Sequence, residues 1–501
     1  MNIKKYWLRI RGYLHLSKRF DSKDEKRKNS HFFIKNYVSN LDNVSKHRFS
    51  PFLHYKIKEN RFRRVIEEYS SKKTSHRIYV QKPRPIFYCN HLDAQILAYY
   101  GDKINKLLEN EYKKNANLND SVIGYRAIPH NEYINKSTIN FAGEAFDFIK
   151  TNPELNLVVA CLDISSFFDN LNHKELKRAW YKIQNRRTLN DDEYNVFKAV
   201  TQSHFIDIEE LLPLLPNFDQ KSRSFLYKSK KNQLITSLSE LRLRLSKYPW
   251  LIKRYDKNNT KKGIPQGTPI SAVFSNLYFL EADKKIAKLL SDHRGIYRRY
   301  SDDILIVCPE YYFEDIYKSL KEVIADLKLE ISEAKNQLGY LTKKSINEDW
   351  NLSFFQNGIL LNKPISYLGF SFDSKKIIIK NSSISKYYRS AKRLIRRSAH
   401  FAKQRQDFNK INKKTKDEWI YKRRIFQTKS YLGAKRRKVG GKVYWGNFIS
   451  YVKNAAKIMN DKRILNQVKN HWKIINDTIK MYEKKYDLKE QKPSSIKDLK
   501  Q

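Results

Sequence analysis

The segment that most constrains the fold is residues 298–307, where two strand-like runs flank the turn Ser301-Asp302-Asp303. Residues 296–300 predict one β-strand and residues 304–307 predict the next, so the two form a hairpin. Adjacent carboxylates at a hairpin tip concentrate negative charge that water or cations must neutralise, and hard divalent ions prefer oxygen ligands. Because Asp is also an ordinary turn residue, this segment alone leaves a plain surface turn open.

Two other segments favour a charged site over a plain turn. Residues 157–162 form an apolar run typical of a buried strand, and the run ends in Asp163, a carboxylate that adds nothing to the stability of such a strand. Between this run and the hairpin lies the loop Gly263-Ile264-Pro265-Gln266-Gly267, which leads into a helical pattern through Asn276 and Asp283. Chemistry-bearing residues therefore stand at the ends of predicted elements in three separate segments.

The order and wording of these segments resemble the palm of the reverse transcriptases. Asp163 with Phe168 five residues later resembles motif A, Pro265-Gln266-Gly267 resembles motif B, and Tyr300-Ser301-Asp302-Asp303 resembles motif C. The resemblance covers about residues 77–372. It implies an α+β fold of the right-hand polymerase type, with fingers, a palm built on an RNA-recognition-like antiparallel sheet plus helices, and a helical thumb.

Composition indicates a polyanionic partner. Lys and Arg number 100 against 52 Asp and Glu, a formal charge of +48, and aromatic residues make up 13% of the chain, which suits base stacking. A low-GC genome would raise Lys, Tyr, Asn and Ile together, but it would not explain their clustering. The three cysteines Cys89, Cys161 and Cys308 offer no disulfide framework or zinc spacing, so we expect a reducing cytoplasm. No window holds 18 uncharged apolar residues, so we expect no membrane span.

We predict four regions along the chain. They are a basic N-terminal extension (1–65), fingers (66–150), a palm (151–372) with an insertion of unknown role (about 171–262), and a basic helical thumb with a C-terminal extension (373–501). Residues 381–501 hold 34 Lys and Arg against nine Asp and Glu. This bias predicts a nucleic-acid-binding thumb, with a solvated helical bundle as the alternative.

The resemblance also implies binding roles around the predicted active site. Lys82 and Arg84 match the fingers residues that clasp the incoming triphosphate, although the turn here is shorter than usual in the family. Gln266 and Gly267 would lie near the base and sugar of the nucleotide. The residues expected to contact template or primer are Arg126, Tyr300, Leu368 and Gly369.

Nucleotidyl transfer explains why carboxylates stand at these positions. Asp163 and Asp302 would bridge two Mg²⁺ ions about 4 Å apart, with Mn²⁺ as a substitute, and the carbonyl of Ile164 would complete one shell. Asp303 would be more peripheral, because neighbouring strand residues face opposite ways. Lys335, in a segment that resembles motif D, would stabilise the leaving pyrophosphate. Phe168 would collide with a ribose 2′-hydroxyl, which favours deoxynucleotides.

The expected function is that of an RNA-directed DNA polymerase that copies an RNA template, in particular a partner non-coding RNA, into DNA from dNTPs. Retron boxes, a Cys/His endonuclease cluster, and ribonuclease H or integrase segments are not found in the sequence. What remains resembles the stand-alone bacterial enzymes of the abortive-infection and defence-associated groups. The rival readings are an RNA-directed RNA polymerase, which Phe168 disfavours, and an inert nucleic-acid-binding scaffold, which the three carboxylates disfavour. Priming mode and oligomeric state stay open.

Overall fold

The computed structural model describes most of the chain. The described residues are 24–69, 72–215, 238–256, 258–356, 358–413, 418–434 and 446–490, with short pieces at 7–9, 11–13, 15–16, 218–219, 224–225, 234, 437–439 and 442–444. None of the helices in these ranges is long and apolar enough to cross a membrane.

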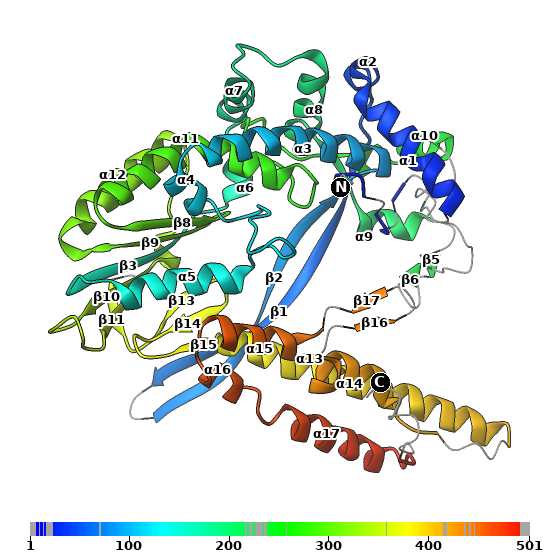
Figure 1. The fold of residues 1–501 in the computed structure, drawn as a ribbon. Helices are drawn as coiled ribbons and strands as arrows, with labels where there is room; N and C mark the ends of the chain where they lie inside the picture. The colour runs from blue at the N-terminus through cyan, green and yellow to red at the C-terminus, as the bar shows by residue number, and fades with distance from the viewer. Residues whose placement is uncertain are drawn as a thin grey trace.

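A six-stranded sheet forms the centre of the molecule (Figure 1). Its strand order is β12-β11-β10-β3-β9-β8, and every neighbouring pair is antiparallel. The strands are β3 (Asn156–Asp163), β8 (Ile296–Tyr300), β9 (Asp303–Pro309), β10 (Gln337–Thr342), β11 (Asn351–Gln356) and β12 (Ile359–Leu361). The predicted hairpin and the predicted buried strand are thus confirmed, and β3 lies next to β9 in the middle of the sheet.

Strand β3 is apolar throughout because both faces of the sheet are covered. Its alternate residues Val158, Ala160 and Leu162 pack into one core cluster, with helices α11 (Ser271–Asp292) and α12 (Phe313–Asp326). The intervening residues face a second cluster, with helix α5 (Thr138–Thr151). A small sheet completes that second face; it consists of β13 (Ile365–Tyr367), β14 (Phe370–Phe372) and β15 (Ile377–Ile379).

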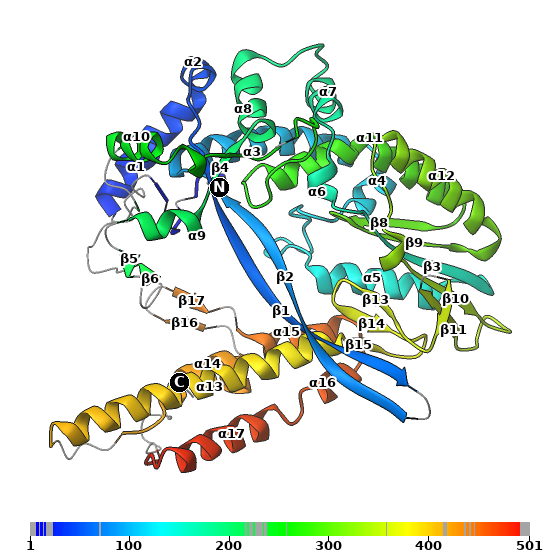
Figure 2. The same cartoon turned by 180° about the vertical axis from the view of Figure 1, so that it is seen from behind.

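A long antiparallel hairpin, β1 (Phe52–Tyr69) and β2 (Lys72–Tyr88), runs diagonally across the molecule (Figures 1 and 2). The predicted boundary at residue 65 is wrong, because it falls inside β1. The prolines Pro83 and Pro85 lie within the second strand and do not end it. They lie two apart on β2, which is an edge strand, so both missing N–H groups fall on the unpaired side of the hairpin.

The segment predicted as an insertion belongs to the same sheet as this hairpin. It holds α7 (His173–Ile183), α8 (Asp191–Thr201), β4 (His204–Asp207), α9 (Ile208–Leu211), β5 (Phe218–Asp219), β6 (Ser224–Phe225), α10 (Leu238–Lys247) and β7 (Lys253–Arg254). Strand β4 pairs in parallel with β1, and β7 pairs with β4. The run from Ile206 therefore begins as a strand because the base of β1 offers it an edge to pair with.

Helix α3 (His91–Lys113) shows how spacing produces the helical layer. Ile96, Tyr100, Ile104, Leu108 and Tyr112 recur every four residues, and each is at most 1% exposed. Other helices in the N-terminal part of the chain are α1 (Asp24–Ser39), α2 (Leu41–Ser45), α4 (Ala116–Ser121) and α6 (Phe167–Asn170).

The C-terminal region is helical, as predicted. Its elements are α13 (Asn381–Ile411), α14 (Lys422–Lys429), β16 (Arg437–Val439), β17 (Lys442–Tyr444), α15 (Phe448–Ile458), α16 (Arg463–Asn466) and α17 (His471–Lys485). Helices α13 and α17 pack through Ile395, Ile475 and Ile479, all at most 1% exposed. Helix α15 places Ile449 and Val452 in the core cluster of α5, so this region is packed onto the central sheet.

A buried ion pair lies beneath the hairpin of β8 and β9. Arg299 and Asp283 have no solvent exposure, and the guanidinium Nη2 lies 2.6 Å from the carboxylate Oδ2. Arg299 also donates to the carbonyl of Ser301 (3.2 Å) and to the side chain of Asn276 (3.3 Å), while Tyr297 donates to Asp283 (2.7 Å). Helix α11 is thereby fastened to the turn between the two strands.

We predict that Asp283→Asn lowers the free energy of unfolding by about 3–5 kcal/mol, because it leaves the buried guanidinium without its counter-charge. Urea titration followed by tryptophan fluorescence measures the loss. Asp102→Asn is the matched control, since Asp102 pairs with Lys106 on a helix surface where the lysine is 71% exposed. That change should cost less than about 0.5 kcal/mol. Equal losses of unfolding free energy in the two variants would show that the buried pair contributes no more stability than the exposed pair.

Candidate active site

Strand pairing brings the three predicted carboxylates to one end of the central sheet. Asp163 is the last residue of β3 and lies opposite Asp303, the first residue of β9. The amide of Ile164 donates to the carbonyl of Asp302 (3.1 Å), which joins the end of β3 to the turn. Ser301 makes that turn in the left-handed region (φ +63°), so Asp302 and Asp303 follow directly at the tip. The structure therefore gathers residues that lie about 140 positions apart in the sequence.

The carboxylates repel one another. The pKa of Asp302 is raised, first by desolvation and then by the charge of Asp163. Desolvation, followed by the charges of Asp302 and Asp163, raises the pKa of Asp303 to about 6. Lys335 opposes both shifts. Its ammonium binds the carboxylate of Asp163, from the short helix η4 (Glu333–Lys335).

The donor set suits a hard divalent cation, since such ions prefer carboxylate and carbonyl oxygens. Desolvation, and after it the charges of the neighbouring carboxylates, raises the pKa values of Asp302 and Asp303, so a cation would stabilise their charged forms. Within the described ranges, no three His, Cys, Asp or Glu side chains already stand in a metal-holding arrangement. The amide of buried Ile164 is held by Asp302, and the metal role predicted for the Ile164 carbonyl stays a prediction.

The Pro-Gln-Gly loop is held between two other segments. Its Gln266 carbonyl accepts a hydrogen bond from the amide of Phe87 in β2 (2.8 Å). Gly267 has φ +99°, and a Cβ there would lie 2.8 Å from the side chain of Ile86. At the other end of the loop, the amide of Ile264 donates to the carbonyl of Phe168 (2.8 Å). The loop thus links the base of the long hairpin to the residue predicted to select the sugar.

Phe168 is half-buried against Phe167, with ring centroids 5.3 Å apart. On the long hairpin, Arg84 is exposed and lies opposite Ile57. Lys82 lies two residues before Arg84 on the same strand, and its side chain is outside the described part of the chain. The nucleotide roles of these residues stay predictions.

Arg126 does not lie where a template could touch it, so that prediction is wrong. Its side chain is 2% exposed and pairs with Glu109 at 2.8 Å. The five N–H groups donate to Glu109, to Asn119 and to the carbonyl of Val122. A guanidinium satisfied in this way holds the loop of residues 122–126 in place and contacts no external phosphate.

The other predicted primer and template contacts lie on turns. Tyr300 stands beside Tyr125, with ring centroids 5.9 Å apart. Leu368 (φ +42°) and Gly369 (φ +91°) form the turn between β13 and β14, and the Gly369 carbonyl accepts from the amide of Lys380 (3.0 Å). The contacts of these residues with template or primer stay predictions.

Sequence reasoning missed the residues that support the hairpin from below. Asn276 and Asp283 lie seven residues apart on the same face of α11, and this polar pair in a buried helix was the available signal. Gly124 supports the same turn from another side. Its backbone packs on the turn so closely that a Cβ would lie 2.7 Å from the amide nitrogen of Ser301 and 2.9 Å from the Cα of Tyr300.

Comparison with known proteins identifies the class. The family model of reverse transcriptase (RNA-dependent DNA polymerase) matches residues 72–372, more than half of the chain. The chain therefore belongs to the reverse transcriptase family, whose members are RNA-directed DNA polymerases, a class of nucleotidyltransferases that use divalent metal ions. The α+β right-hand polymerase fold predicted from the motifs is confirmed.

More distant similarities are to telomerases of known structure. Apo telomerase from Candida tropicalis, truncated from the C-terminal domain, shares 12% identity over 70% of this chain and 60% of its own, with a TM-score of 0.32. Telomerase from Candida albicans in complex with a TWJ fragment of telomeric RNA shares 12% identity over 93% of this chain and 68% of its own, with a TM-score of 0.34. The chain thus spans less than two thirds of the first of these proteins. No curated protein matches the sequence.

We predict that Gly124→Ala lowers DNA synthesis by about a hundredfold, because a side chain there would displace the turn that carries Asp302 and Asp303. Primer extension on an RNA template measures the loss, and circular dichroism checks that the fold is kept. Gly101→Ala is the matched control, since its new Cβ would lie 3.6 Å from the nearest atom, an ordinary contact. Wild-type activity in Gly124→Ala would contradict the close packing.

Proposed function

We propose that this chain synthesises DNA on an RNA template at the end of the central sheet, with Asp163, Asp302 and Asp303 as the catalytic carboxylates. One observation carries the proposal. The register of β3 with β9 sets Asp163 directly opposite Asp303, with Asp302 beside them in a turn that Arg299 and Gly124 hold from two sides. Nothing in the packing of β3 requires a carboxylate at that point.

The three carboxylates would hold two Mg²⁺ ions, which when bound activate the primer 3′-hydroxyl and offset the charge of the leaving pyrophosphate. The chain's own part is to supply fixed oxygen atoms. Asp163 and Asp302 offer them from different elements, and the hydrogen bond from Ile164 to Asp302 keeps the two elements together. Lys335, already at Asp163, would supply positive charge for a departing phosphate.

Phe168 supports the choice of deoxynucleotides. Its backbone carbonyl is held by Ile264 and its ring rests on Phe167, so the ring cannot easily move away from a 2′-hydroxyl. Gln266 and Gly267 would lie along the same nucleotide, with Arg84 and Lys82 on its phosphates. Arg suits that role because its planar fork binds phosphate oxygens bidentately.

Helix α13 would bind the template–primer duplex. Its buried stripe, Ala391, Ile395 and Ala399, packs on the helical bundle. The opposite side exposes a basic row: Lys392, Arg393, Arg396 and Arg397. None of these four forms an ion pair with a carboxylate within the described residues, which leaves their charge available for phosphates.

We propose further that the template is a partner non-coding RNA and that the biological role is antiphage defence. The support is the resemblance to stand-alone bacterial enzymes and a formal charge of +48. Sequencing the nucleic acid that co-purifies with the protein from its host tests both points. A single abundant RNA species with matching DNA would support the proposal, and random host RNA would contradict it.

We predict that Asp302→Asn reduces DNA synthesis by more than about a hundredfold, since metal ions contribute several kcal/mol to the transition state. RNA affinity should change less than about twofold, because the phosphates are bound elsewhere. Primer extension and fluorescence anisotropy measure the two quantities. Asp292→Asn, the same charge change at an exposed helix end, is the control. Synthesis close to wild type in Asp302→Asn would refute the metal assignment.

We predict that Phe168→Ala raises incorporation of ribonucleotides relative to deoxynucleotides by about tenfold to a hundredfold, since one steric contact accounts for about that much discrimination. Single-nucleotide extension with rNTP and dNTP in parallel gives the ratio, so each reaction controls the other. An unchanged ratio would place the sugar-selecting contact elsewhere, and a wild-type enzyme that prefers rNTPs would identify an RNA polymerase.

We predict that replacing Lys392, Arg393, Arg396 and Arg397 by Gln flattens the salt dependence of duplex binding by about three in log–log slope, one phosphate for each residue. Anisotropy titrations at several salt concentrations measure it. Substitution is preferable to deleting the region, because α15 and α16 supply core residues to the central sheet. An unchanged slope would show that α13 only presents a solvated face.

A further inference from the structure

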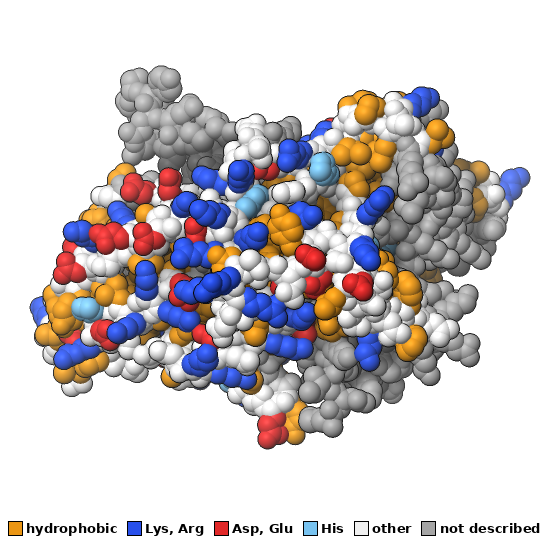
Figure 3. Space-filling model, turned by 90° about the horizontal axis from the view of Figure 1, so that it is seen from above, with side chains coloured by type: hydrophobic (Ala, Val, Ile, Leu, Met, Phe, Trp, Pro, Cys, Tyr) orange, Lys and Arg blue, Asp and Glu red, His pale blue; other side chains and the backbone are white. Residues whose placement is uncertain are grey.

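The insertion carries two adjoining pockets that contain none of the predicted catalytic residues. The first, of about 470 Å³, lies between α7, α8, the loop of residues 254–261 and the end of α12. The second, of about 350 Å³, lies between the base of β1, the end of α8 and β4. Gln202 lines both, so the two pockets adjoin at this residue. Figure 3 views the molecule from above, the side that α7 and α8 occupy in Figure 1, and shows many Lys and Arg side chains on this face.

The first pocket is strongly basic. The cations that line it are Lys174, Lys177, Arg254, Lys261 and Lys328. In the part of the chain that the structure describes, none of the five is paired with a carboxylate. The single acid of the lining, Asp256, accepts hydrogen bonds from the amides of Thr260 and Lys261 (2.9 and 2.8 Å), which lower its pKa. Five cations from three elements around one acid make an anion site.

An aromatic face stands among these charges. Tyr194 is 38% exposed, and the ammonium groups of Lys177 and Lys198 lie 4.5 and 5.0 Å from the centre of its ring. Proteins that bind single strands combine such aromatic faces, on which bases stack, with cations that follow the backbone.

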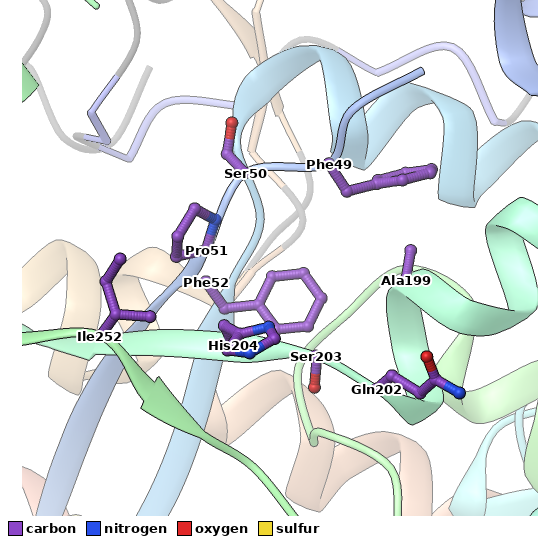
Figure 4. Close-up of a pocket in the computed structure, with 9 residues that line it drawn as sticks. All are labelled: Phe49, Ser50, Pro51, Phe52, Ala199, Gln202, Ser203, His204 and Ile252. Carbon is purple, nitrogen blue, oxygen red and sulfur yellow. The ribbon is translucent and has the colours of Figure 1, made fainter. Parts of the chain in front are cut away.

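The second pocket suits a nucleobase (Figure 4). Phe49, Phe52 and His204 give it an aromatic lining. Ser203 also lines it; the residue is only 5% exposed, and its Oγ has no hydrogen-bond partner among the described residues. Because this Oγ is buried below the pocket surface, a base would be held by the aromatic side chains that line the pocket.

We infer that the two pockets seat a single-stranded polynucleotide, with phosphates among the five cations, one base on Tyr194 and a neighbouring base beside Ser203. Two adjoining pockets offer more room than one nucleotide fills, which favours a strand over a free nucleotide. The existence of this site does not depend on the proposed polymerase activity. Only the identity of the strand rests on the proposed function, in which the strand is the partner RNA. The site also gives the insertion a role beyond completing the hairpin sheet.

The test is photo-crosslinking of the full chain to a 4-thiouridine-labelled RNA of about ten nucleotides. Crosslinked peptides should contain Tyr194 or Lys177. The variant Lys174→Ala/Lys177→Ala should weaken binding of this RNA about tenfold and flatten its salt slope by about 1.4. Tyr194→Ala should remove the crosslink at that peptide. The control Lys285→Ala/Lys288→Ala removes two exposed lysines at the same spacing on α11 and should change neither.

Parallel reactions distinguish the ligands. A 4-thiothymidine-labelled DNA of the same sequence shows whether the strand is RNA or either nucleic acid. UMP that competes as well as the strand would show a mononucleotide site and overturn the inference, as would crosslinks confined to the palm or equal losses in the control. Extension of a short hairpin primer–template is measured alongside. Synthesis without the Tyr194 crosslink refutes only the second site, and the crosslink without synthesis refutes only the proposed polymerase.

Discussion

The buried pair of Arg299 and Asp283 is the interaction on which the geometry of the site depends. Removing two charges from water is costly, and the cost is offset only when each lone pair and proton has a partner. Here Tyr297 and Asn276 complete the set, and Arg299 uses one donor on the carbonyl of Ser301. The same carbonyl precedes Asp302, so the ion pair fixes the backbone from which the predicted catalytic carboxylates project.

The negative charge of the carboxylates at the end of the sheet opposes this fixed geometry. Desolvation, followed by the charges of neighbouring carboxylates, raises the pKa values of Asp302 and Asp303, and Lys335 binds the carboxylate of Asp163 directly. The mutual repulsion of the carboxylates would splay the end of the sheet if it were held by these residues alone. Apolar packing on both faces of β3 and the close contact of Gly124 with the turn oppose it. The interior of the palm thus stabilises an arrangement that its surface residues disfavour.

The elements that carry the site could be predicted because local pattern and local structure agree there. Residues 296–300 became β8, and the apolar run before Asp163 became β3. What could not be predicted depends on contacts distant in sequence. The sequence predicted Arg126 as a template contact, but Glu109 and Asn119 bind its side chain. Strand β4 likewise forms against β1, which lies about 150 residues earlier in the chain. Burial of a charged residue cannot be read from its neighbours in the chain.

The loop of motif B shows why glycine occupies both of its ends. Gly267 lies against Ile86 and Phe87 of β2, where a Cβ would clash. A Cβ added at Gly263 would lie 2.8 Å from the carbonyl oxygen of Asp169. The carbonyl of Gly263 is also bound by His173 of α7 (2.7 Å). Hairpin, palm and insertion therefore meet at one short loop. A side chain at either glycine would push two of these three parts away from each other. The loop therefore holds the predicted nucleotide-binding residues in fixed positions relative to one another.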